Sequence, residues 1–264
     1  MTAVSDVLAK AKADGRAALI GYLPVGYPSV DVSIDAMRAM VAAGVDIVEV
    51  GVPYSDPVMD GPTIQAATEQ AVRAGVGLRD ALAAVRAVVD AGAAAVTMGY
   101  WNQIERYGVD RFATDLAAAG GSGAITPDLI PEEAAEWIAA SDRTGLDRVF
   151  LVAPSSTDAR IVSTAAASRG FVYATAVMGV TGARDAVGGA AATLVGRVRS
   201  LAPQIPVCVG LGVSSGAQAA EVASFADGVI VGSALVKRLL DSPDAAGVAA
   251  VGELSAELAE GVRR

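Results

Sequence analysis

Two acidic side chains, Glu49 and Asp60, have the residue type and the spacing that acid–base chemistry requires. Glu49 interrupts an apolar run formed by Ile47, Val48 and Val50, which is typical of a strand buried on both faces. Asp60 follows in a loop rich in proline and glycine. A buried glutamate is rare unless it is paired or takes part in a reaction. Carboxylates at a strand end and in the following loop can act as general acid and base, so the sequence predicts an active site here.

Each acid also has a structural explanation. Glu49 could be a core carboxylate that a neighbouring amide or arginine satisfies. Asp60 belongs to an Asp-Gly-Pro sequence that is common in turns. A third acid in the loop, Asp56, is expected to make a turn or loop contact. The residues alone favour catalysis for Glu49 and leave Asp60 open.

Two glycine-containing turns have the composition of an anion site. Gly210-Leu211-Gly212-Val213-Ser214 and Gly232-Ser233-Ala234 each follow an apolar run and open a helical pattern, and neither first helical turn carries an acid. Exposed N–H groups at such places, backed by the helix dipole, bind anions. Either turn alone is also ordinary after a strand. The pair, in corresponding places, predicts a phosphate group on the substrate.

Two connections are longer than the roughly 2–6 residues usual between a strand and a helix. They span residues 51–62 and 176–189, and the second contains Gly179, Gly182, Gly188 and Gly189. Loops of this kind often close over a substrate and exclude water. Two surface insertions are the simpler alternative.

Residue types that the chain lacks exclude other chemistries. It has no histidine, which rules out a Ser-His-Asp triad and histidine-ligated metals, and we expect no metal. Lysine occurs only at Lys10, Lys12 and Lys237, in helical patterns, so a Schiff base is not expected. The single Cys208 allows no internal disulfide and favours a reducing cytoplasm. A net charge of −9 argues against nucleic acid and anionic membranes as partners. Without an apolar leader or a run of about 18 apolar residues, a soluble cytoplasmic protein is expected.

Eight apolar runs alternate with helical patterns along the chain. Strands are expected at residues 17–23, 46–50, 94–100, 123–126, 148–152, 171–175, 207–209 and 229–231. Continuous apolar runs are typical of parallel strands covered on both faces. The pattern predicts an α/β fold, a single (β/α)8 TIM barrel over residues 1–264 with an extra N-terminal helix at 3–13. A doubly wound sheet is the alternative, and in both folds ligands bind at the carboxyl ends of the strands.

This pattern indicates a phosphosugar-type enzyme and leaves lyase and isomerase open, but longer motifs go further. Pro-Tyr-Ser-Asp-Pro at residues 53–57, followed by Asp-Gly-Pro-Thr at 60–63, closely resembles the tryptophan synthase alpha subunit family. Segments that match in the same order lie at residues 22–28, 100–108, 127–133, 170–184 and 226–234. The resemblance covers about residues 15 to 240.

The family cleaves indole-3-glycerol phosphate to indole and glyceraldehyde 3-phosphate by a retro-aldol reaction. The resemblance implies that Glu49 protonates indole C3 and takes the glycerol hydroxyl proton, while Asp60 holds the indole N–H. Thr181 is expected to secure the closed lid and help orient Asp60. The remaining implied contacts are Tyr22, Tyr100, Ile125 and Pro127 for the indole side, Tyr173 for the pocket wall, and Gly182, Gly212, Gly232 and Ser233 for the phosphate.

The resemblance also implies a partner. Family members work with a beta subunit in an alpha2-beta2 assembly, and that subunit carries pyridoxal phosphate and receives the indole through a tunnel. The loop over residues 53–60 is expected to face it, and this chain is expected to need no cofactor of its own. Met59, Leu211 and the apolar segment 174–178 depart from the family pattern, in ways that bear on affinity and partner coupling.

Other functions stay open at this point. One is a stand-alone indole-glycerol phosphate lyase, which would be fast without a partner. Another is a non-catalytic activating subunit, against which the intact carboxylates and turns argue. A phosphosugar isomerase is more distant, because such barrels generally use a lysine or histidine electrophile that this chain lacks.

Overall fold

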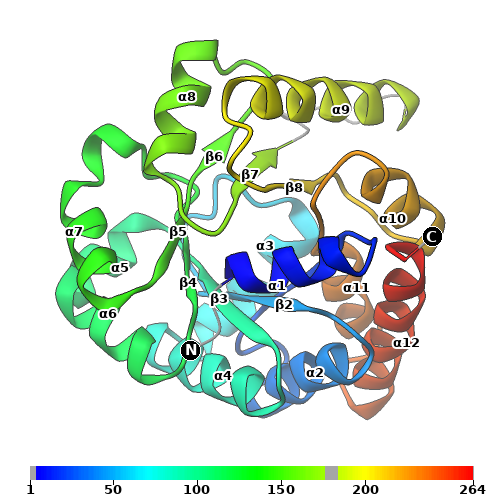
Figure 1. Cartoon of the computed structure of the whole chain (residues 1–264). Helices are drawn as coiled ribbons and strands as arrows, with labels where there is room; N and C mark the ends of the chain where they lie inside the picture. Colours follow the sequence, from blue (N-terminus) through cyan, green and yellow to red (C-terminus); the bar gives the residue numbers. More distant parts are fainter. Residues whose placement is uncertain (1–3, 176–183, 264) are drawn as a thin grey trace.

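The computed structural model is a barrel of parallel strands surrounded by helices (Figure 1), and it describes residues 4–175 and 184–263. Neighbouring strands pair in the order β5-β4-β3-β2-β1-β9-β8-β7-β6. The strands are β1 Ala18–Pro24, β2 Ile47–Gly51, β3 Ala94–Met98, β4 Gly123–Ile125, β5 Asp147–Val149, β6 Leu151–Val152, β7 Val172–Thr175, β8 Val207–Gly210 and β9 Gly228–Val231. Neighbouring strands follow the chain order and the last strand, β9, pairs with the first, β1, so the doubly wound alternative is wrong and the barrel prediction is confirmed.

The strand predicted at residues 148–152 is two short strands, β5 and β6, separated only by Phe150. β5 pairs with β4 and β6 pairs with β7, so this one stretch of chain joins the two ends of the sheet order. Phe150 keeps its backbone in the ring, since its carbonyl accepts a hydrogen bond from Tyr173 N–H at 3.1 Å. The barrel thus has eight positions around its ring, as expected, although nine strands are assigned.

Helices cover the outside of the barrel. They are α1 Val4–Ala13, α2 Val30–Ala42, α3 Pro62–Arg73, α4 Leu78–Asp90, α5 Trp101–Tyr107, α6 Val109–Ala118, α7 Ala135–Thr144, α8 Asp158–Ala167, α9 Arg184–Leu201, α10 Gly216–Ala223, α11 Ser233–Asp241 and α12 Ala245–Gly261, with a 3-10 turn η1 Pro131–Glu133. α1 lies across one end of the barrel, and the apolar stripes of the other helices pack on the outward-facing strand residues in one large core.

Three predicted elements differ from the structure. The helix expected after β3 is broken into α5 and α6 at Gly108, whose φ of 97° favours glycine. The helix expected to begin at Pro131 begins with the turn η1, and α7 follows at Ala135. The long loop expected at residues 176–189 is shorter, because α9 begins at Arg184, and residues 176–183 lie outside the described part.

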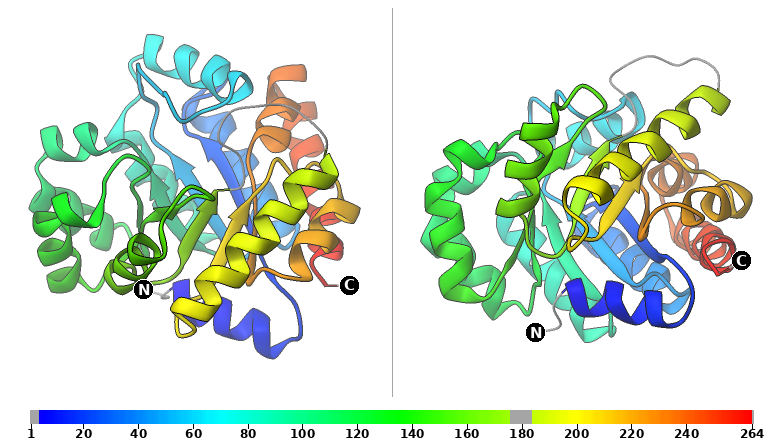
Figure 2. Two further views of the ribbon diagram at one scale, coloured as in Figure 1. Left: turned by 90° about the horizontal axis from the view of Figure 1, so that it is seen from above. Right: turned by 45° about the horizontal axis from the view of Figure 1, so that its top comes forward.

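The extra N-terminal helix closes one end of the barrel. Val4, Leu8 and Ala11 of α1 pack against side chains inside the barrel, such as Ile20 and Ile47. Figure 2 shows α1, in dark blue, lying across this end. The Asp147 carboxylate accepts a hydrogen bond from Val4 N–H at 2.9 Å. The open end of the barrel is therefore the opposite one, at the carboxyl ends of the strands.

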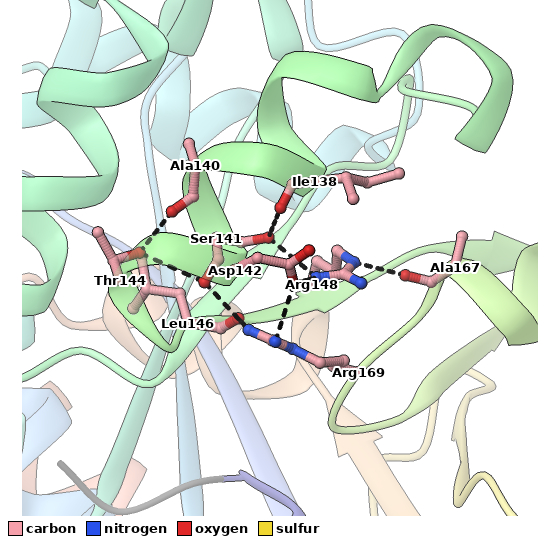
Figure 3. Close-up of polar contacts among 9 residues, drawn as sticks. All are labelled: Ile138, Ala140, Ser141, Asp142, Thr144, Leu146, Arg148, Ala167 and Arg169. Carbon is pink, nitrogen blue, oxygen red and sulfur yellow. Dashed lines mark hydrogen bonds and ion pairs between the residues drawn. The ribbon is translucent and has the colours of Figure 1, made fainter.

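An arginine network holds the helices near the closed end (Figure 3). Arg148 lies on β5. It donates to Ser141 Oγ at 3.1 Å, to Asp142 Oδ1 at 2.6 Å and to the Ala167 carbonyl at 2.6 Å. Arg169 donates to the same Asp142 oxygen at 2.9 Å. The hydrogen bond from Arg148 is the main reason that the pKa of Asp142 is lowered. These contacts join the ends of α7 and α8 to β5, far from the open end, so they contribute to stability and not to the site.

Candidate active site

Glu49 points into the barrel because side chains alternate along β2. Ile47, two residues earlier, belongs to the interior cluster, whereas Val48 and Val50 pack outward under the helices. Glu49 is 1% exposed, and its Oε1 atom has no hydrogen-bond partner among the described residues. Burial disfavours the charged form and raises the pKa of Glu49 to about 8. At neutral pH this residue is therefore a carboxylic acid with a proton to give.

Asp60 reaches the same site from the loop between β2 and α3. Its N–H donates to the Pro57 carbonyl at 3.0 Å, and its own carbonyl accepts from Gln65 Nε2 at 2.8 Å. Burial raises the pKa of Asp60 to about 6, which leaves it mostly ionised at neutral pH. The two carboxyl groups thus differ in protonation state, which is the arrangement that divides acid and base roles. Asp56, by contrast, accepts from Ser55 Oγ at 2.6 Å within the loop, as the turn interpretation predicted.

Both carboxyl groups line a cavity of about 210 Å³ at the carboxyl ends of the strands. Tyr22 and Tyr173 stand beside them, and burial, together with the nearby charges of Asp60 and Glu49, raises the pKa of both hydroxyls. Each ring depends on a glycine. A Cβ on Gly51 would lie 2.6 Å from the Tyr22 hydroxyl, and one on Gly210 would overlap the Tyr173 hydroxyl.

The anion site uses one of the two helix N-termini that the sequence predicted. Gly232 begins α11 without a side-chain cap, so the first amide groups of this helix face the cavity beside Ser233 and Gly212. The start of α10 is already occupied: Gly216 N–H donates to the Glu257 carboxylate at 2.7 Å, and Ser214 N–H to Gln218 Oε1 at 2.8 Å. α11 is therefore the helix whose N-terminus is available for a phosphate.

Most of the predicted site residues meet around this cavity. Those that line it are Tyr22, Glu49, Asp60, Pro127, Tyr173, Gly212, Gly232 and Ser233. Tyr100 is not among them; its hydroxyl accepts a hydrogen bond from Met59 N–H at 2.9 Å instead. Ile125 is fully buried in the interior cluster and does not line the cavity; its contact with the indole stays a prediction. Thr181 and Gly182 lie outside the described residues.

Several lining residues were not among the predicted substrate contacts, although Met59, Gly210 and Leu211 lie in stretches that the sequence singled out. They are Met59, Gly61, Ile64, Met98, Leu151, Thr175, Gly210, Leu211 and Ile230. Met37 and Met40 are buried in the core, whereas Met98 lies at the carboxyl end of β3 and lines the cavity. Their positions near strand ends could have identified three of these residues from the sequence, namely Met98, Leu151 and Thr175. The additional walls are mainly apolar, which suits a flat aromatic group.

The described residues contain neither a candidate metal site nor a candidate membrane-spanning helix. No group of three or more His, Cys, Asp or Glu side chains there could hold a metal ion. No helix in this part of the chain is long and apolar enough to cross a membrane. Acid–base chemistry on a phosphorylated, partly aromatic substrate is what the cavity supports, which places the chain among barrel enzymes of the lyase or isomerase kind.

Comparison with known proteins narrows this class to one family. The family model for the tryptophan synthase alpha chain matches residues 8–262. A tryptophan synthase alpha chain from Thermobifida fusca is 62% identical over 266 residues, with 100% of this chain and 98% of the relative covered. One from Nocardia farcinica is 62% identical over 260 residues, with 98% and 96% covered.

Solved structures agree. A structure of Mycobacterium tuberculosis tryptophan synthase superposes with a TM-score of 0.92 at 59% identity, with 99% of this chain and 98% of that chain covered. Tryptophan synthase subunit alpha from Legionella pneumophila gives 0.89 at 30% identity, with 99% and 98% covered. The chain belongs to the tryptophan synthase alpha chain family. It is a carbon–carbon lyase that cleaves indole-3-glycerol phosphate, and the indole passes to a beta subunit for tryptophan synthesis.

Proposed function

We propose that Glu49 and Asp60 divide the work of this cleavage according to their protonation states. The observation that carries the proposal is the pair of unequal pKa values, about 8 for Glu49 and about 6 for Asp60, in one cavity. A proton donor must hold its proton at working pH, and an electrostatic stabiliser must be charged. Glu49 meets the first requirement and Asp60 the second.

The reaction then proceeds with its protons balanced. Glu49 gives its proton to indole C3, and Asp60 accepts a hydrogen bond from the indole N–H and stabilises the resulting cation. The Glu49 carboxylate next removes the proton from the hydroxyl on the carbon bonded to C3. The electrons of that O–H bond form the aldehyde, the bond to C3 breaks, and its electrons return to the ring. Indole and glyceraldehyde 3-phosphate leave, and Glu49 is protonated again.

The rest of the cavity binds the two ends of the substrate. Gly212, Gly232 and Ser233 hold the phosphate at the N-terminus of α11, where no acid competes. Tyr22, Pro127 and Tyr173, with apolar walls such as Leu211 and Ile64, enclose the indole. For Thr181 and Gly182 the expected roles in lid closure and phosphate binding stay predictions.

The chain works without a cofactor of its own in this proposal, because the two carboxyl groups supply the acid, the base and the charge that the reaction needs. Its lysines support the same view: Lys237, for example, donates to Asp241 within α11 at 2.7 Å. Pyridoxal phosphate belongs to the beta subunit. The buried free thiol of Cys208 fits a cytoplasmic enzyme.

We place the beta subunit against the loop over residues 53–60. Val58 is 81% exposed and Met59 is 51% exposed, and large apolar side chains exposed together favour a protein partner. An alpha2-beta2 assembly is the arrangement that the family resemblance implies. This loop also carries Asp60, so a partner that orders it would raise the rate.

The test is indole release from indole-3-glycerol phosphate by the purified chain, with and without a beta subunit. We expect slow release alone, a sharp rise with the partner, and a loss of at least about 100-fold in Glu49→Gln and Asp60→Asn. Fast release alone would favour a stand-alone lyase. Unchanged turnover in Glu49→Gln would refute the proposed proton transfer.

A further inference from the structure

The loop that carries Asp60 leaves the sheet just after β2. Val52 N–H donates to the Met98 carbonyl at 2.8 Å, and this is the last backbone bond that ties the loop to β3. Further on, the N–H groups of Val58 and Asp60 bond only to carbonyls within the loop. Among the described residues, the position of the loop over the barrel therefore depends on side-chain contacts.

Gln65 of α3 donates to the Asp60 carbonyl at 2.8 Å, and the first turn of α5, with its N-cap residue Tyr100, supplies one contact at each end of the loop. Gln103 Nε2 donates to the Pro53 carbonyl at 2.6 Å, where the loop begins. The Tyr100 hydroxyl accepts from Met59 N–H at 2.9 Å, directly before Asp60. The loop is thus held at its first residue and at the peptide that precedes the proposed stabilising carboxylate.

This turn is itself fixed to the barrel. Trp101 N–H donates to Asp128 Oδ1 at 2.9 Å, and Gly99 N–H donates to the Ile125 carbonyl at 3.2 Å. Tyr54 of the loop stacks on the Tyr100 ring, with centroids 4.8 Å apart. Anchors on a rigid element can hold a catalytic group in a productive position, whereas anchors on another mobile loop could not.

A glutamine at position 103 has a cost for stability. Its Oε1 atom is buried without a hydrogen-bond partner in the described structure. The Pro53 carbonyl can only accept a hydrogen bond, so Nε2 must face it and the Oε1 atom is left without a partner. An unpaired buried oxygen lowers stability, and leucine would fill similar space without it. The bond to Pro53 is the contribution that leucine could not make.

We propose that Gln103 is a positioning residue for the lyase reaction: with Tyr100, it holds the loop so that Asp60 meets the indole nitrogen. The inference rests on the role proposed above for Asp60. It assigns the residue a part in turnover although it does not line the cavity.

The test is steady-state indole release by the full-length chain carrying Gln103→Leu. We expect kcat to fall about tenfold, since misplacing a reacting group by about 1 Å costs up to about 100-fold. KM should change less than about twofold, because the phosphate site lies on α11. The melting temperature should change little, because leucine removes the unpaired Oε1 atom but leaves the Pro53 carbonyl without its donor. The matched control is Gln70→Leu, an exposed glutamine whose side chain bonds only to the Ala66 carbonyl of its own helix at 3.5 Å, and it should leave kcat unchanged.

A second variant, Gln103→Glu, keeps the shape and tests the bond itself. A carboxyl group can donate to Pro53 only when protonated, so its kcat relative to the wild-type chain should fall as pH rises. A constant ratio across the pH range would overturn the inference. A Gln103→Leu variant with wild-type kcat would also overturn it. So would a variant whose kcat and melting temperature both fall and whose KM rises.

A double-mutant comparison separates this inference from the proposed function. If Gln103 acts through Asp60, Gln103→Leu should have little further effect on kcat in an Asp60→Asn background. An equal tenfold loss in both backgrounds would overturn the inference. If Asp60→Asn alone keeps full activity, the proposed function itself fails. If Asp60→Asn is inactive while Gln103→Leu is not impaired, only the positioning role is wrong.

Discussion

Replacing Glu49 with glutamine should make the free protein more stable, by an amount that depends on pH. The folded chain keeps the Glu49 proton up to a pKa of about 8, whereas the unfolded chain releases it near 4.5. Between these values the folded state binds more protons than the unfolded state, so this residue's contribution to stability falls as pH rises. At about 1.4 kcal/mol for each pH unit, the wild-type chain loses roughly 3 kcal/mol by pH 7 and about 1 kcal/mol by pH 5. Glutamine does not titrate, so the Glu49→Gln variant avoids this loss.

The assay is urea unfolding followed by tryptophan fluorescence, for both proteins at pH 5 and pH 7. The free energy of unfolding of Glu49→Gln should exceed that of the wild-type chain by about 2 kcal/mol more at pH 7 than at pH 5. Comparing the two pH values removes any constant effect of the substitution. Glu253→Gln, on the exposed face of α12, is the control and should show no such change. A stability difference that stays constant between pH 5 and pH 7 would refute the burial argument.

Three further predictions concern activity and the two ends of the barrel. The kcat/KM of the wild-type chain should rise through pH about 6 as Asp60 ionises and fall through pH about 8 as Glu49 loses its proton; a flat profile between pH 5 and pH 9 would count against both roles. Gly210→Ala should lower kcat/KM by at least about tenfold, because the new Cβ displaces the Tyr173 ring, and an unchanged value would show that the ring is not held. Arg148→Met should lower the free energy of unfolding by about 1–3 kcal/mol with kcat unchanged, since its bonds lie at the closed end; denaturation and turnover assays on one preparation would separate the two effects.

The position of Glu49 could be predicted from the sequence because its signal is local. An acid inside an apolar run must face either the core or a cavity, and the alternation along β2 decides only which face it occupies. Asp60 had no such signal, since Asp-Gly-Pro is ordinary in turns, and only the family resemblance gave it a particular role in the reaction. The structure supplies the missing distinction: Asp60 lines the cavity and Asp56 bonds within the loop.

The anion site could be predicted only in part, for a physical reason. Both glycine turns open helices, but the Glu257 carboxylate, 41 residues beyond Gly216 in the chain, occupies the start of α10. No local pattern reveals such a long-range cap. The sequence likewise could not show that Ile125 is buried beneath the cavity, because the depth of a residue along a strand decides whether it lines the cavity or the core below it; its contact with the indole stays a prediction.

The anchors of the Asp60 loop were also invisible in the sequence. The family resemblance implied that Tyr100 contacts the indole, but it gave no sign that the Tyr100 hydroxyl accepts a hydrogen bond from Met59 N–H. Gln103 gave no signal at all, since its partner is a backbone carbonyl 50 residues earlier in the chain. Contacts of this kind depend on how two strand-end connections pack, which residue types do not encode.

The most direct test of the account is the protonation state of the two carboxyl groups in the free enzyme. Carbon-13 NMR of chains labelled at the Glu and Asp carboxyl groups, with Glu49→Gln and Asp60→Asn for assignment, measures both titrations. The account predicts a Glu49 midpoint of about 8 and an Asp60 midpoint of about 6. A Glu49 midpoint near its ordinary value of 4.5 would contradict it, because that residue would hold no proton to give indole C3 at neutral pH.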